Sequence, residues 1–223
     1  MCKTVSLGGI VACLIVALSP VLADQGLQSG PTLGQDLPGP LQILNATGEW
    51  VGKYHCPVCE VGLNSGVLIF TRELPQPGQP LTKLLQSLEG SMEHHTGRPA
   101  GVAVLLIGDG GYKEALETKV DEKGKVTELR LTKAILYKDE KLGQLAGLAR
   151  DAKLKHTVLA LAAPEDVKNY RLHKDADITV VGYARHKVLV NRAYAKDQLT
   201  PAEADKLSAE LTKNLPNVGI PKY

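Results

Sequence analysis

Apolar runs of strand length alternate with segments of helical periodicity between residues 66 and 215. The runs at 67–71, 102–107, 158–161 and 178–183 are almost wholly apolar, which is typical of strands that are buried on both faces. A sheet with two buried faces needs helices on both sides. The sequence therefore predicts an α/β fold, with a three-layer α/β/α sandwich around one central sheet.

The segments between these runs carry the helices. The first has apolar residues at helical spacing after Pro80, which suits the first turn of a helix: Leu81, Leu84, Leu85, Leu88 and Met92. The second places Leu142, Leu145, Ala146, Leu148 and Ala149 on one face. We expect a short helix through Val167 and Tyr170, and a closing helix from Pro201 with Ala204, Leu207, Leu211 and Leu215 on its apolar face.

Two further features complete the predicted fold. His186-Lys187 is expected to turn the chain between the run at 178–183 and a last strand at 188–190, which adds an antiparallel edge and makes the sheet mixed. Residues 112–139 form a charged insertion in the pattern. Within it, residues 126–132 alternate like a strand, and residues 121–124 (Asp-Glu-Lys-Gly) indicate a turn.

The N-terminal residues have the features of a targeting signal. Lys3 precedes an apolar stretch from residue 7 to residue 18 that is too short to span a bilayer, and Val21-Leu22-Ala23 fits a cleavage site. We interpret residues 1–23 as a signal peptide, residues 24–49 as a Pro/Gly-rich linker that builds no core, and residues 50–223 as the folded domain. The mature protein is then expected to be secreted or periplasmic.

Charge and aromatic content exclude several classes of partner. The formal net charge is +2, and lysines and glutamates are mixed along the chain, which argues against binding to nucleic acid. One Trp, one Phe and seven Tyr are too few for a stacking surface. No phosphate-binding loop or other cofactor motif is present, so we predict no cofactor. The expected partner is a protein of the cell envelope, with no membrane contact after signal cleavage.

A Cys-Pro-Val-Cys sequence holds the only thiols left after signal removal, Cys56 and Cys59. In an oxidising compartment the pair can form a disulfide, and it can also act as a redox pair with His55 lowering a thiol pKa. A third possibility is a zinc or copper site, in which His55, Cys56 and Cys59 are completed by His94 and His95. The stretch after Cys59, residues 60–66, is rich in turn formers and is not expected to be helical.

The order of elements resembles the thioredoxin-like superfamily, and most of all its exported peroxiredoxin-type and thiol–disulfide branch. The likeness rests on residues 66–73 as the first core strand, Tyr170-Arg171-Leu172 before the late strand, residues 178–183, and residues 200–215 as the last helix. It implies a reactive Cys after the first core strand and a cis-Pro before the late strand. Residues 73–82 contain no Cys, and residues 176–179 contain no Pro but an acid, Asp177.

These departures favour a thioredoxin-like domain that has lost the usual active site of its family. The leading interpretation is an exported, non-catalytic binding or scaffolding module. The first alternative is a thiol–disulfide oxidoreductase that uses Cys56 and Cys59 in cell redox homeostasis, and the second is a protein that handles copper or zinc.

Overall fold

A mixed seven-stranded sheet forms the centre of the protein. The structure, a computed structural model, describes residues 27–93, 99–108, 121–125 and 128–216. The sheet has the order β2-β1-β5-β4-β3-β6-β7. Strand β3 lies between β4, which is parallel to it, and β6, which is antiparallel. The strands are β1 (Ile43–Asn45), β2 (Tyr54–His55), β3 (Ser65–Thr71), β4 (Gly101–Ile107), β5 (Thr157–Ala162), β6 (Ile178–Ala184) and β7 (Lys187–Tyr194).

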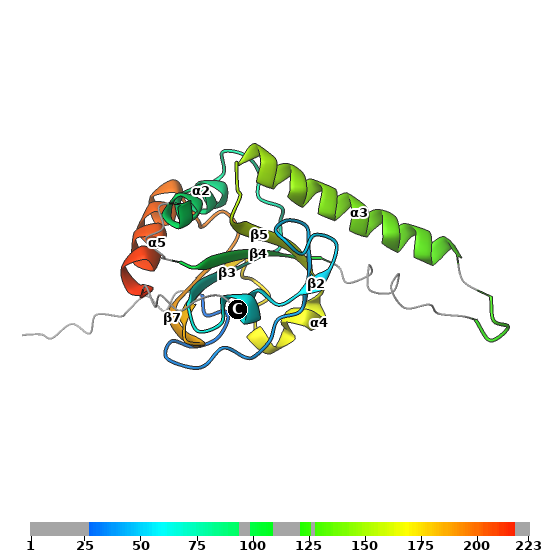
Figure 1. Cartoon of the computed structure of the whole chain (residues 1–223), viewed down its shortest axis with the longest axis horizontal. Helices are drawn as coiled ribbons and strands as arrows, with labels where there is room; N and C mark the ends of the chain where they lie inside the picture. Colours follow the sequence, from blue (N-terminus) through cyan, green and yellow to red (C-terminus); the bar gives the residue numbers. More distant parts are fainter. Residues whose placement is uncertain (1–26, 94–98, 109–120, 126–127, 217–223) are drawn as a thin grey trace, which may run out of the picture.

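Helices cover both faces of this sheet and make three layers. The long helices α2 (Pro80–Glu93), α3 (Glu128–Asp151) and α5 (Pro201–Asn214) lie on one face, and α4 (Pro164–Val167) lies on the other (Figure 1). The short helix α1 (Pro57–Val61) shares the face of α4, and a 3-10 turn at Lys168–Tyr170 continues α4. The predicted α/β/α sandwich is confirmed, and its strand order from β3 onward is that of the thioredoxin-like fold.

Alternation along the central strand divides the core in two. Val67 and Ile69 of β3 pack with the apolar faces of α2, α3 and α5, in what we call the first core. Leu68 and Phe70 point the other way, into a second core that contains Val58 of α1 together with α4 and the N-terminal segment. Because successive side chains of a strand point to opposite faces, the two cores lie on opposite sides of the sheet.

The element order predicted from residue 66 onward is confirmed, with two corrections. Residues 128–132 belong to α3, so the strand expected at 126–132 is wrong over these positions, and residues 126–127 lie outside the described residues. The last hairpin turns at Arg185-His186 rather than one residue later, because Ala184 already pairs with Lys187. The turn expected at residues 121–124 is present, with Gly124 N–H bonded to the Asp121 carbonyl at 2.8 Å.

The segment described as a linker takes part in the fold. Ile43 lies within β1 and is fully buried, as is Leu41, so the expectation that residues 24–49 build no core is wrong. Residues 34–37 also run beside β7, where an isolated bridge joins Asp36 to Lys187 and protects the edge of the sheet. The apolar residues of this segment have no regular period, because part of the segment forms a short strand and another part runs along the edge of the sheet.

A buried carboxylate fastens α2 to the start of β5. Glu89 is 4% exposed. Its two oxygens accept hydrogen bonds of 2.6–2.9 Å from the backbone N–H groups of Lys155, His156 and Thr157, and from the Thr157 hydroxyl. Burial alone would raise the pKa of Glu89, but these hydrogen bonds outweigh it and the pKa lies below the usual 4.5.

The fully buried side chains of β3 and β4 lead to a prediction about stability. Ile69→Ala or Leu105→Ala is expected to lower the free energy of unfolding by about 2–5 kcal/mol, because each removes side-chain volume from a packed core.

The Cys56→Ser/Cys59→Ser double variant is expected to keep a cooperative urea transition, since a four-residue loop constrains the unfolded chain little. A double variant that is already unfolded without urea would contradict this prediction.

A second prediction concerns Glu89. Its lowered pKa means that the carboxylate stabilises the fold at neutral pH, and that this contribution is lost as the pH falls below about 4.5. Glu89→Gln should therefore be less stable than wild type at neutral pH, and the difference should shrink on acidification. Urea unfolding across this range measures it, with the exposed Glu165→Gln as the control. A difference that is independent of pH would contradict the assignment.

Candidate functional site

Cys56 and Cys59 form a disulfide at the start of helix α1, with 5.2 Å between their Cα atoms. Cys56 is the N-cap of the helix and Pro57 is its first residue. Sequence reasoning missed this helix, which takes in Glu60 and Val61 before ending at Gly62. The Pro directly after Cys56 is a signal that could have indicated it, because Pro is favoured at the first helical position.

The two sulfur-bearing residues have opposite exposure. Cys56 is buried in the second core, with 3% of its surface exposed. Its Sγ accepts hydrogen bonds from the backbone N–H of Leu41, at 3.4 Å, and from that of Cys59, at 3.1 Å. Cys59 itself is exposed to solvent. A reagent can therefore approach Cys59, while Cys56 has two donors that favour a negative charge on its sulfur.

An aromatic and ionic group of residues surrounds the start of α1. The His55 ring stacks on Trp50, with centroids 4.6 Å apart and an angle of 15° between the planes. Its Nε2 lies 3.2 Å from Glu60 Oε2, within ion-pair distance but outside hydrogen-bond geometry. The Lys53 ammonium lies 5.8 Å from the centroid of the Trp50 ring. The charged group next to Cys59 in the helix, Glu60, therefore lies beside His55, which pairs with it when protonated.

Close contact with β4 fixes the position of α1 on the sheet. A Cβ atom on Gly101 would lie 2.6 Å from Val61 Cγ2, so the helix packs directly against the backbone of β4. A small cavity of about 40 Å³ remains beside it, lined in part by Glu60, His156 and Tyr183. Burial raises the pKa of Tyr183, and the nearby Tyr170 and Glu60 raise it further, so its ring stays neutral.

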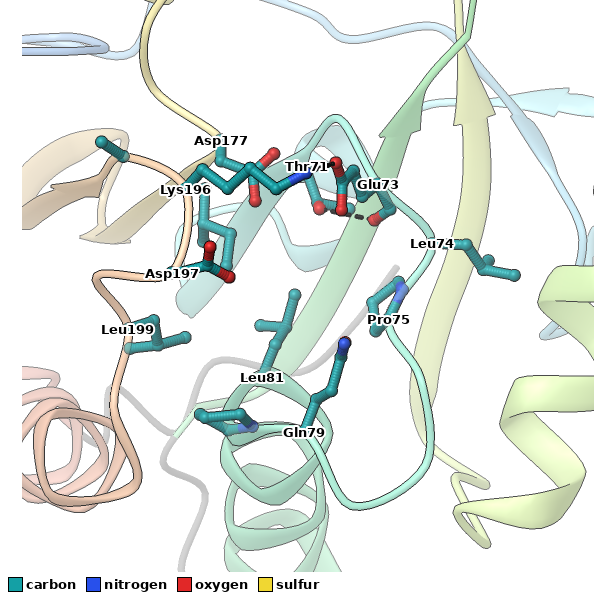
Figure 2. Close-up of a pocket in the computed structure, with 13 residues that line it drawn as sticks. Thr71, Glu73, Leu74, Pro75, Gln79, Leu81, Asp177, Lys196, Asp197 and Leu199 are labelled. Atoms are coloured by element: carbon teal, nitrogen blue, oxygen red, sulfur yellow. Dashed lines mark hydrogen bonds and ion pairs between the residues drawn. The ribbon is translucent and has the colours of Figure 1, made fainter.

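A second pocket lies where β3 ends and α2 begins, which is the place where the resemblance implies a reactive Cys. It measures about 110 Å³ and is lined by polar and charged residues that include Glu73, Asp177 and Lys196, with no sulfur among them (Figure 2). Lys196 Nζ lies 2.8 Å from Glu73 Oε1 across its mouth. Its apolar residues Leu81 and Leu199 belong to the first core, whereas Cys56 belongs to the second. The disulfide and this pocket are therefore separate sites.

Asp177 lies directly before β6, in the stretch 176–179 where the resemblance implies a cis-Pro and the chain has none. Its backbone carbonyl accepts the N–H of Arg72, directly after β3, and it precedes the first residue of β6. Partial burial raises the pKa of its carboxyl group, and the charge of Glu73 raises it further. An acid here disfavours a neighbouring thiolate, in agreement with the absence of Cys from the lining of the pocket.

Some of the predicted sites lie beyond what the structure tests. His94 and His95 lie outside the described residues, so of the predicted metal ligands the structure places only His55, Cys56 and Cys59. Among the described residues no cluster of three or more His, Cys, Asp or Glu side chains is arranged to hold a metal.

The predicted signal peptide, residues 1–23, also lies outside the described residues. In the described part of the chain, no helix combines the length and the apolar character needed to cross a membrane.

Comparisons with known proteins support a likeness in fold and nothing further. No protein-family model matches the chain, and no curated protein matches it. Similar solved structures include reduced Prx3 from Vibrio vulnificus with hydrogen peroxide (11% identity, 80% of this chain and 98% of that chain, TM-score 0.49). A secreted Mycobacterium tuberculosis disulfide oxidoreductase homologous to DsbE has 11% identity over 78% and 96%, with a TM-score of 0.46. Copper-bound ScoI from Arabidopsis thaliana has 10% identity over 78% and 98%, with a TM-score of 0.41.

These identities and scores transfer no function to this chain. The assignment of the thioredoxin-like fold rests on the strand order, and the chemistry has to be argued from the residues around α1.

The pocket without a thiol generates a prediction about peroxide. We expect the protein to consume no hydrogen peroxide above background in the presence of dithiothreitol, because the loop after β3 supplies no peroxidatic sulfur. Residual peroxide measured over time tests this, with the Cys56→Ser/Cys59→Ser variant as the control. Peroxide consumption that is lost in that variant would overturn the prediction.

Proposed function

We propose that this domain is a thiol–disulfide exchange protein whose reactive pair lies on α1 instead of in the loop after β3. The observation that carries the proposal is the asymmetry of the pair. Cys59 is exposed, whereas Cys56 is buried and accepts two backbone N–H groups. A disulfide that serves stability alone needs no such difference between its two sulfurs.

The asymmetry assigns a role to each sulfur. An incoming thiolate attacks Cys59 Sγ and forms a mixed disulfide, the Cys56–Cys59 bond breaks, and Cys56 leaves as a thiolate. The N–H groups of Leu41 and Cys59 stabilise that charge, and a stabilised leaving group accelerates exchange. A second substrate thiolate then attacks the substrate sulfur of the mixed disulfide, which releases an oxidised substrate and leaves both protein cysteines reduced.

This order reverses the one usual for a CxxC pair at a helix start, in which the capping Cys is the residue that reacts with substrate. Here the capping Cys is buried in the second core, to which the N-terminal segment and α4 also contribute, and the backbone N–H of Leu41 donates to its sulfur. The third residue along, Cys59, is on the solvent side of α1. The reversal follows from the position of α1 flat against the sheet face.

The proposal also includes the place of action. Disulfides persist in oxidising compartments, so a domain that works from its oxidised form fits the export predicted from residues 1–23.

The rival function is the non-catalytic binding module. It is favoured by the acidic pocket at the end of β3, which has the location of the family's site without its sulfur.

Single cysteine variants distinguish these functions. Cys56→Ser leaves the exposed Cys59 free, and it should react with a disulfide reagent such as 5,5′-dithiobis(2-nitrobenzoate) at least about ten-fold faster than Cys59→Ser, whose remaining thiol is buried. The oxidised wild type should also accept electrons from a dithiol peptide in a stoichiometric reaction. Equal reaction rates for the two variants would contradict the assigned roles, and a wild type that oxidises no dithiol would favour the binding module.

A further inference from the structure

The carboxylate of Glu60 lies near Cys59, the sulfur that meets the substrate in the proposed exchange. Glu60 follows Cys59 in α1, and the Cα atoms of consecutive residues are about 3.8 Å apart, so the carboxylate lies within about 10 Å of Cys59 Sγ. That distance is comparable to the Debye length at physiological ionic strength. The side chain of Glu60 is 33% exposed, and its Oε2 lies 3.2 Å from His55 Nε2.

The described cations near this carboxylate leave it only partly compensated. His55 is charged only when protonated. The Lys53 ammonium lies 5.8 Å from the centroid of the Trp50 ring, and His55 is the only described basic residue within ion-pair distance of Glu60. An incoming thiolate therefore approaches Cys59 in the field of a negative charge, and it is repelled more strongly if the rest of the substrate is also negative.

From this arrangement we infer that Glu60 is a specificity-determining residue, which selects against anionic thiols and in favour of thiols that carry a neighbouring positive charge. The inference rests on the proposed function. It identifies the substrate class as protein or peptide cysteines flanked by Lys or Arg, and it disfavours small acidic thiols such as glutathione, whose carboxylates give it a net negative charge.

A series of small thiols of similar size and different charge tests the inference. The oxidised protein is reduced by cysteamine, 2-mercaptoethanol and 2-mercaptoethanesulfonate, and each rate is divided by the thiolate concentration. Because the thiolates also differ in intrinsic nucleophilicity, the quantity compared between proteins is the ratio of these rates. In Glu60→Gln the ratio of the cysteamine rate to the sulfonate rate should fall about two- to four-fold at low salt.

The matched control is Asp205→Asn, which removes one exposed carboxylate from α5 on the opposite face of the sheet and should leave the ratio unchanged. A second measurement needs no variant: in wild type the ratio should decline as salt is raised, because the charges are screened. An unchanged ratio in Glu60→Gln, or one that is independent of salt in wild type, would overturn the inference.

These outcomes differ from failure of the proposed function. If no thiol in the series reduces the disulfide, or if reduction begins at Cys56, the exchange function itself is wrong. If 2-mercaptoethanol reduces the pair through Cys59 but the charge of the thiol has no effect, exchange stands and the role of Glu60 is rejected.

Discussion

Strand β3 is buried on both faces and paired on both edges. The other layers of the protein lie where they cover its two apolar faces. All seven of its residues are buried, with β4 and β6 as neighbours in the sheet. The alternation of Val67 and Ile69 with Leu68 and Phe70 requires two separate apolar covers. The long helices supply the first. The second is assembled from short pieces, including α1, α4 and part of the N-terminal segment.

The second cover explains how a disulfide comes to have one buried and one exposed member. Helix α1 has few residues, and it lies close enough to the sheet that Val61 meets the backbone at Gly101. Val58 and Val61 are buried with Cys56, and Cys59 is left on the outer side of the same helix. Packing that stabilises the sheet therefore also determines which sulfur a substrate can reach.

The sequence predicts the larger part of this fold, because its strands and long helices have clear periods. Strands β3 and β4 are predicted by apolar runs of strand length, and helix α2 is predicted by apolar residues at helical spacing. Short elements without a full period were not predictable in this way. Leu41 precedes, and Ile43 begins, a three-residue strand that pairs with β5, far along the chain. Residues 128–132 alternate in the sequence although they belong to a helix.

The sequence predicts which residues make up the candidate site, but it does not predict their geometry. The pair of Cys residues is visible in the sequence, and so is the lack of a thiol after β3. Cys56 is buried beside Leu41, whose N–H donates to its sulfur, and Leu41 belongs to a segment whose composition predicts only a linker. The approach of His55 to Glu60, at 3.2 Å, likewise depends on helix α1, and the turn formers at residues 60–66 do not indicate a helix there.

The central claim is that substrate enters through Cys59 and that Cys56 is the leaving group. Peptide mass mapping of the oxidised wild-type protein tests it most directly, after brief exposure to a limiting amount of 2-mercaptoethanol and an acid quench. We predict the added thiol on Cys59, with Cys56 recovered as a free thiol that an alkylating reagent marks after denaturation. The added thiol on Cys56, with Cys59 free, would contradict the claim.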